Sequence, residues 1–173
     1  MKYQKIIATC FCGDAAAKLK LAEGLAESYG KDLEQNDSIK DGLAKARILV
    51  STLDAQMADM DMGRICSGCA ARVDGGCCST YMGNENNDAL LLLMNHLAGV
   101  EVSLVCDNGV ECSFLGKKGC ILLLKPIFCL NYLCKQIRAR ASAEEIILLE
   151  QKSGALLTAQ YQLEQLLIGF LQR

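Results

Sequence analysis

The sequence predicts a mainly α fold with a small antiparallel β element (α+β), in which long helices flank a cysteine-rich module. Two observations predict the helices: 51% of the residues are hydrophobic, with much Leu and Ala among them, and apolar residues recur at steps of three and four. The clustering of 11 cysteines predicts the module. We expect a single domain over 1–173, with a helical N-terminal part at 1–62, the cysteine module at 63–136 and a C-terminal helix at 137–173.

Two helices are predicted in the N-terminal part. Asp14 is a candidate N-cap for a helix over 14–35, whose apolar residues share one face. Ser38 and Asp41 form a capping-box signature that starts the next helix. Its apolar residues alternate steps of four and three, which is typical of a narrow bundle seam. They are Ile39, Leu43, Ala46, Val50, Leu53, Met57 and Met60.

The first half of the cysteine module is predicted to be a loop followed by a short helix. Residues 63–84 are rich in Gly, Ser and Asp, which favours a loop. Ala89 to Ala98 is apolar on every side and ends at Gly99, so we expect a buried helix there.

The second half of the module carries the β signals. Apolar residues alternate with polar ones on both sides of Asp107-Asn108-Gly109, which predicts a β-hairpin over 100–114. A second reversal at 116–119 leads into a predicted strand at 121–124.

The last part of the chain is predicted to be helical. Pro126 marks the first turn of a helix that carries Cys129 and Cys134. Ser142 and Glu145 form a capping box at the start of the C-terminal helix. One apolar seam follows it, formed by Ile146, Leu149, Leu156, Leu163, Leu167 and Phe170. We expect the long helices from the two ends of the chain to pack together.

Eight of the cysteines form two groups and are the strongest functional signal. The first group is Cys66, Cys69, Cys77 and Cys78, and the second is Cys112, Cys120, Cys129 and Cys134. Thiolates are preferred ligands of zinc, of Cu(I) and of iron–sulfur clusters. No apolar stretch has the length of a secretory signal or a membrane span, so we expect a cytoplasmic protein. Cysteines in a reducing compartment indicate metal ligands rather than disulfides.

The spacing inside the groups gives further expectations. Cys66-x2-Cys69 is typical of a knuckle that chelates one ion. Adjacent side chains diverge, so we expect Cys77 and Cys78 either to face different centres or to include one packed thiol. Cys112 and Cys120 lie on either side of a turn, which can bring them together.

The second group belongs to a longer pattern that extends over about residues 64–136. It reads Cys112-Ser-Phe-Leu-Gly-Lys-Lys-Gly-Cys120, then Lys125-Pro126-x2-Cys129-x2-Tyr132-x-Cys134. Together with Cys66-x2-Cys69 and Cys77-Cys78, this resembles the zinc- or iron-chelating cysteine-cluster (CxxCxxCC) family, which includes flagellin lysine methylases. The resemblance implies that these eight cysteines are ligands of zinc or iron, and an iron–sulfur cluster is implicated for the flagellin lysine methylases. The chain departs from the family pattern in having seven residues between Cys69 and Cys77, and Lys125 where arginine is usual.

Several functional classes are disfavoured by composition. A net charge of −2 and a pI near 5.5 argue against a nucleic-acid-binding protein. The single histidine, His96, excludes a multi-histidine metal site, and we expect it to be packed within its apolar helix. The chain contains no phosphate loop, nucleophile elbow or dinucleotide fingerprint, so whether it is an enzyme stays open.

We therefore expect an iron–sulfur protein with one or two [4Fe–4S] clusters and a role in redox transfer, metal handling or cluster-assisted chemistry. The alternative is a zinc-stapled module that binds a protein partner. In either case the long helices are candidates for contact with a partner or a second copy, and we expect no contact with nucleic acid or a membrane.

Overall fold

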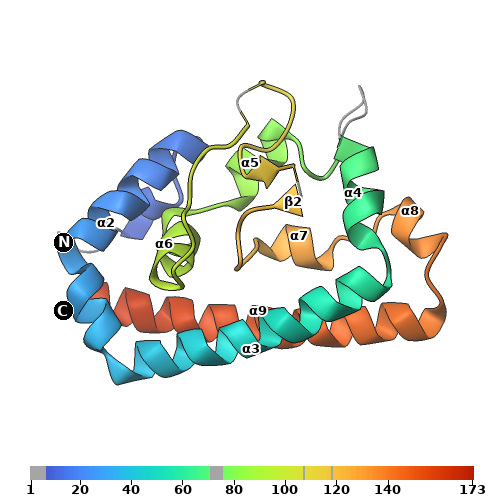
Figure 1. Cartoon of the computed structure of the whole chain (residues 1–173). Helices are drawn as coiled ribbons and strands as arrows, with labels where there is room; N and C mark the ends of the chain where they lie inside the picture. The colour runs from blue at the N-terminus through green and yellow to red at the C-terminus, as the bar shows by residue number, and fades with distance from the viewer. Residues whose placement is uncertain (1–6, 71–75, 107, 118) are drawn as a thin grey trace.

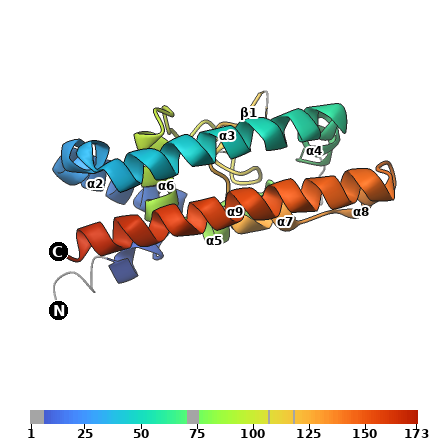
Figure 2. The same ribbon diagram turned by 90° about the horizontal axis from the view of Figure 1, so that it is seen from below.

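Two long antiparallel helices form the base of the fold (Figures 1 and 2). They are α3 (Asp37–Asp59) and α9 (Ala143–Leu171), and they pack against each other along their length. The computed structural model of the chain describes residues 7–70, 76–106, 108–117 and 119–173. The expected pairing of the long helices is confirmed.

The predicted seams of both helices are the faces that they bury. In α3, Ile39, Leu43, Ala46, Val50 and Leu53 are buried, and Met57 and Met60 pack against the core while staying partly exposed. The start of α3 differs from the prediction, because Asn36 rather than Ser38 is the N-cap and accepts a hydrogen bond from Ile39 N. Asn36 is also the C-cap of the preceding helix, so one residue ends one helix and starts the next.

Helix α9 begins at the predicted capping box. The Ser142 hydroxyl accepts a hydrogen bond from Glu145 N at 3.2 Å, and the Glu145 carboxylate accepts one from Ser142 N at 2.8 Å. The helix then continues without a break through Ser153 and Gly154.

Helices α2 (Ala15–Gln35) and α6 (Ala89–Leu97) pack against each other above one end of the base. Asp14 caps α2 by accepting from Ala17 N, as predicted, and Asp88 caps α6 by accepting from Leu91 N. The prediction that α6 is buried on every side holds with one exception. Ala89 to Asn95 and Leu97 are buried, whereas His96 is exposed.

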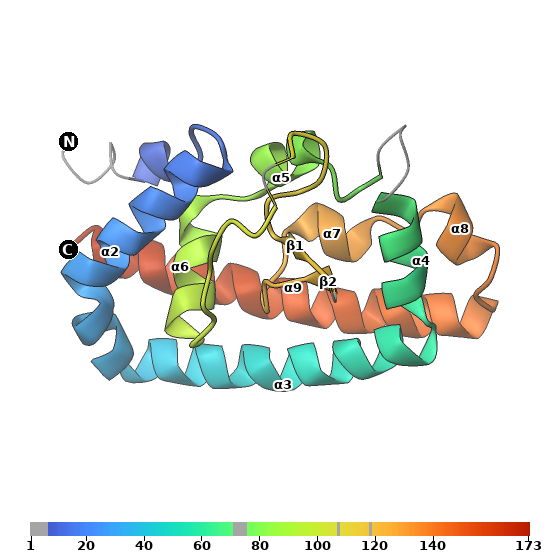
Figure 3. The same ribbon diagram turned by 45° about the horizontal axis from the view of Figure 1, so that its top comes forward.

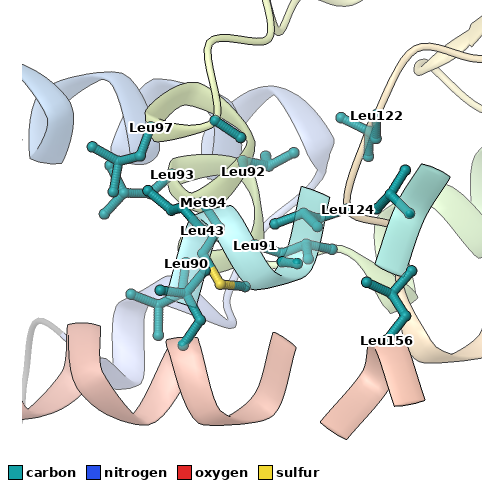
Figure 4. Close-up of a cluster of buried hydrophobic side chains, with 14 of the residues drawn as sticks. Leu43, Leu90, Leu91, Leu92, Leu93, Met94, Leu97, Leu122, Leu124 and Leu156 are labelled. Atoms are coloured by element: carbon teal, nitrogen blue, oxygen red, sulfur yellow. The ribbon is translucent and has the colours of Figure 1, made fainter. Parts of the chain in front are cut away.

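The centre of the core lies where α6 meets the two long helices. Figure 4 shows leucines and Met94 of α6 gathered with Leu43 of α3 and Leu156 of α9. Leu122 and Leu124 join them from the segment after the β-hairpin, with 2% and 0% of their surfaces exposed. Burial of such side chains contributes roughly 1.5–3 kcal/mol each, so this cluster anchors the cysteine module to the helical base.

The rest of the module lies over the base, with α4 and α8 at the end away from α2 (Figure 3). Its elements are α4 (Met62–Ala70), α5 (Thr80–Asn86), β1 (Leu115–Gly116), β2 (Gly119–Cys120), α7 (Ile127–Asn131) and α8 (Lys135–Arg138). The prediction of a loop over 63–84 is wrong for the residues of α4 and α5. Met62 and Ile65 lie three positions apart on α4 and are both buried, so packing overrides a glycine-rich composition.

The β prediction is correct in kind and partly wrong in position. Strands β1 and β2 form an antiparallel hairpin at the second reversal, with Leu115 opposite Cys120. In the predicted hairpin over 100–114, Val105 N and Cys106 N donate to Ser113 O, but no strands form in its described residues, and Asp107 lies outside them. Residues 121–124 are not a strand either.

The backbone of this last segment pairs with a side chain instead of another strand. Asn95 Oδ1 accepts from Leu123 N at 2.8 Å and from Leu124 N at 2.9 Å, and Asn95 Nδ2 donates to Leu124 O at 2.8 Å. The amide thus supplies the hydrogen bonds that a neighbouring strand would make.

The structure is mainly helical with a two-stranded antiparallel sheet, as the sequence predicts. Within the described ranges, every helix is too short or too polar to cross a membrane.

Candidate metal centre

Five of the predicted ligands line one pocket of about 70 Å³ where α4, α7 and α8 meet. These cysteines are Cys66, Cys77, Cys78, Cys129 and Cys134. Its apolar wall includes Met62, Ile65 and Ile137, which are buried. Cysteines from both sequence groups therefore lie in the same place.

The adjacent cysteines Cys77 and Cys78 both line this pocket. Whether the two face different centres, or one of them is packed, stays a prediction. Their segment ends at Ser79, the N-cap of α5, whose backbone is extended.

Cys112 and Cys120 approach the same thiols from the β-hairpin. Burial raises the pKa of the Cys78 thiol to about 12, and the nearby thiols of Cys66, Cys112, Cys120 and Cys77 add to the rise. This electrostatic coupling requires proximity, because interactions between charges weaken with distance. Cys78 of the first group is thus close to both members of the hairpin pair.

Cys129 on α7 shows the same coupling. Burial raises its thiol pKa to about 12, and Cys120, Cys78, Cys112 and Cys77 reinforce the effect. Each of these thiols resists ionisation mainly because of burial, and neighbouring thiolates would add to the cost. The two cysteine groups therefore form one cluster of thiols.

Backbone pairing holds the two groups together. Cys112 N donates to Cys78 O at 2.7 Å, and Thr80 N donates to Val110 O at 2.9 Å. The Thr80 hydroxyl adds a hydrogen bond to Glu111 O at 2.7 Å. This short antiparallel contact fixes the end of the first group against the start of the second.

Close approach at α5 depends on a glycine. A Cβ atom on Gly83, which is buried, would lie 2.8 Å from Cys112 Sγ and 3.5 Å from its Cβ. Such a distance is shorter than van der Waals contact, so a larger residue would push Cys112 away from its neighbours.

The helix predicted to carry both Cys129 and Cys134 is broken in two. Helix α7 ends at Asn131, and Cys134 is the N-cap residue of α8. Two cysteines five positions apart on one regular helix would point in different directions. The break between α7 and α8 allows Cys129 and Cys134 to line the same pocket. Phe128 and Tyr132 stack across the break with ring centroids 4.8 Å apart.

Local groups partly offset the burial of the hairpin thiols. Burial raises the pKa of both Cys112 and Cys120, while backbone hydrogen bonds from Phe114 and Leu122, respectively, lower it. The positive charge of Lys125 also lowers the pKa of Cys120. Such hydrogen bonds and charges are the usual means by which a protein stabilises thiolate ligands.

Three further cysteines lie outside the resemblance. Cys10 is fully buried near the start of α2, and burial, reinforced by Asp88, raises its thiol pKa to about 11. Cys12 is exposed, and its Sγ donates to Ala8 O. Cys106 lies 3.6 Å from a Glu111 carboxylate oxygen and is close enough to Cys112 to raise its pKa.

The side chain of Cys69 lies outside the described residues. Among the side chains that the structure describes, no three from His, Cys, Asp or Glu are placed as a group that could hold a metal ion. The thiols are gathered within electrostatic range but are not in a coordinating arrangement.

His96 lies apart from the thiols, on the side of α6 that faces α2. It lines a different pocket with Leu19, Glu23 and Glu101. The expectation that it is packed is wrong, because it is the exposed residue of an otherwise buried helix.

Sequence reasoning did not identify Gly83 or Asn95 as residues that support the cluster. Gly83 admits Cys112, and Asn95 holds the segment between Cys120 and Cys129. No sequence signal links them to the cysteines, because each contact joins residues far apart in the chain.

Comparison with protein-family models, with curated proteins and with solved structures finds no match to this chain.

Proposed function

We propose that this protein binds an iron–sulfur cluster shared by its two cysteine groups, in a reducing, cytoplasmic compartment. The observation that carries the proposal is the pocket lined by Cys66, Cys77, Cys78, Cys129 and Cys134, which brings cysteines of both groups together. The proposed ligands are drawn from Cys66, Cys77, Cys78, Cys112, Cys120, Cys129 and Cys134, with Cys69 predicted from sequence alone.

The energetics of the cluster support a bound cation. The thiols with raised pKa values, which belong to the half-buried residues Cys78 and Cys112 and the exposed residues Cys120 and Cys129, would remain protonated at neutral pH and would gain little from being close together. A bound metal reverses this preference, because a coordinating thiol is deprotonated outright. Gathering sulfur atoms from four separate segments has an entropic cost that metal binding would offset.

Iron–sulfur chemistry is favoured by the ligand type. Of Cys, His, Asp and Glu, only Cys is found among the described residues that line the pocket, and His96 lies in another pocket. Backbone hydrogen bonds to Cys112 and Cys120 match the hydrogen bonds to sulfur that tune iron–sulfur potentials. Such a centre would serve redox transfer, metal handling or cluster-assisted chemistry.

A zinc-stapled interaction module is the second candidate, because five cysteines line one pocket and four thiolates suffice to hold one zinc ion. In this case the exposed apolar residues Ile48 on α3 and Tyr161 on α9 are candidates for the partner surface.

The test is elemental analysis of full-length protein purified anaerobically, together with its visible absorbance. The proposal predicts iron and acid-labile sulfide with a broad visible absorption. Zinc without iron, in a colourless protein, supports the second candidate and rejects the first. Absence of any metal rejects both.

Substitutions then assign the site. Cys120→Ala and Cys129→Ala are expected to abolish metal retention, because both residues belong to the coupled cluster. Cys12→Ala is the matched control, since Cys12 is exposed and bonded to Ala8 O, and His96→Ala is a second control. Loss of metal in His96→Ala alone would show that the ligand assignment is wrong.

A further inference from the structure

A second pocket lies where α2, α6 and the segment that follows α6 meet. Its volume is about 370 Å³, which is within the range of roughly 300–1,000 Å³ that is usual for binding pockets. Its floor is apolar, because Ala22 and Leu92 lie there with 2% and 1% of their surfaces exposed. The pocket shares no lining residue with the thiol pocket, so it is a separate site.

A tight turn after α6 forms one wall of this pocket. Gly99 has φ +71°, its N–H donates to His96 O at 2.8 Å, and Val100 N donates to Asn95 O at 3.0 Å. A left-handed glycine with these two bonds is the Schellman motif, which ends a helix. The chain then runs back alongside α6 (Figures 1 and 3), and residues 100–102 line the pocket.

This segment has the sequence of a β-strand but no partner strand. Val100, Val102 and Leu104 alternate with polar residues, which is the pattern of a strand. Within the described parts of the chain, the backbone N–H and C=O groups of residues 101–104 make no hydrogen bond. A row of unpaired backbone groups is a template for pairing with another chain.

The charged side chains that line the pocket are of one sign. Glu23 of α2 and Glu101 are exposed, and neither carboxylate forms an ion pair with a described residue. The guanidinium of Arg47 lies beside Gly99, but it donates to Ala98 O and does not line the pocket. Two carboxylates without a cation favour a positively charged ligand.

We propose that this pocket binds an extended, basic segment of a partner protein. The backbone of that segment pairs with residues 101–104 as an added strand. One of its lysine or arginine side chains lies over Ala22 and Leu92 and brings its charge to Glu23 and Glu101. In this mode of recognition the main-chain hydrogen bonds supply affinity and the side-chain pocket supplies selectivity. The long stem of lysine or arginine suits an apolar floor, because these residues bury the stem and leave the charge in water.

The test measures binding of a short fluorescein-labelled peptide of alternating valine and lysine to the full-length protein as purified, by fluorescence anisotropy at low ionic strength. Saturable binding is expected, and the affinity should fall as salt is added, because exposed charges are screened. The same peptide with glutamate in place of lysine should not bind measurably. A lysine peptide with N-methylated backbone amides should lose most of its affinity, because it cannot donate hydrogen bonds to residues 101–104.

Glu23→Gln and Glu101→Gln test the contribution of charge. Each should weaken binding about 2- to 5-fold, which is the effect of removing one exposed ion pair, and the double variant should weaken it further. Glu27→Gln is the matched control, because Glu27 is also exposed on α2 but does not line the pocket. All three side chains are exposed, so the variants should keep the circular dichroism spectrum of the wild-type protein.

Three results would overturn the proposal. The first is the absence of saturable binding, or an affinity of the double variant equal to that of wild type. The second is equal binding of the N-methylated peptide, which would show that no strand is added. The third is a dimer of the protein alone, seen by sedimentation, that dissociates in Val102→Lys, because a second copy would then cover the segment.

Discussion

Replacing Asn95 by leucine should unfold the link between the helical base and the cysteine module. The Asn95 side chain is fully buried and makes hydrogen bonds to Leu91 O, Leu123 N and both backbone groups of Leu124. Leucine is similar in size but makes none of these bonds. The substitution therefore tests the polar contacts while leaving the packing volume nearly unchanged.

The expected loss follows from the backbone groups that remain without a partner. The N–H and C=O of Leu124 are buried, and the N–H of Leu123 is half-buried. Each unsatisfied buried group costs about 1–3 kcal/mol, so the total is about 3–6 kcal/mol after allowing for the solvation of Leu123. This is a large share of the roughly 5–15 kcal/mol that stabilises a typical domain.

The assay is equilibrium urea denaturation of metal-free protein, followed by circular dichroism. With a slope of about 2 kcal/mol/M, the midpoint should fall by about 2 M. Asn87→Leu is the matched control, because Asn87 is a buried amide whose one side-chain hydrogen bond within the described residues runs to Gly83 O, and its loss should cost about 1 kcal/mol. Equal midpoints for Asn95→Leu and wild type would refute the reasoning.

Three further predictions concern the glycine contact, the pH dependence and the core. Gly83→Ala should displace Cys112 and lower metal retention, which metal analysis measures. The Cβ atom of Gly24→Ala meets no atom within 4 Å, so this variant should stabilise α2 by about 0.5–1 kcal/mol, which thermal melting measures. Burial raises the pKa of Asp88. The contribution of this carboxyl group to folding stability is therefore complete at low pH and is lost as the pH rises through the raised pKa. Asp88→Asn keeps an N-cap and should flatten this part of the pH–stability curve, and an unchanged slope would contradict the assignment. Leu93→Ala, at a site with 0% exposure, should cost about 2–5 kcal/mol in urea unfolding, and a loss below 1 kcal/mol would show a looser core than described.

The sequence predicts the long helices well because their signals are local. Asp14 and the pair Ser142–Glu145 cap their helices where expected, and the seams of α3 and α9 are the buried faces. Each of these features depends on residues within a few positions of one another, so periodicity and capping chemistry are sufficient to place them.

Elements fixed by distant contacts could not be placed in this way. Helix α4 forms in a glycine-rich segment because Met62 and Ile65 are buried. Residues 121–124 show a strand-like pattern, yet the partner of their backbone is the side chain of Asn95, which lies 29 positions before Leu124. A local sequence pattern indicates whether a segment is buried. It does not indicate which group forms hydrogen bonds with the buried backbone of that segment.

In the candidate site, too, some features follow from local sequence and others from contacts between distant residues. Cysteine spacing identifies the residues, and the structure gathers seven of the eight predicted ligands around one cluster. Spacing does not indicate that Cys77 and Cys78 line the same pocket, or that α7 ends before Cys134. Those facts arise from tertiary packing around the thiols.

The proposal of a shared centre is tested most directly by the metal content per chain of the Cys78→Ala protein, purified anaerobically beside wild type. Cys78 is coupled to thiols of both cysteine groups, so its loss should remove nearly all of the metal. Retention of about half of the wild-type metal would show two independent sites and would contradict the shared centre.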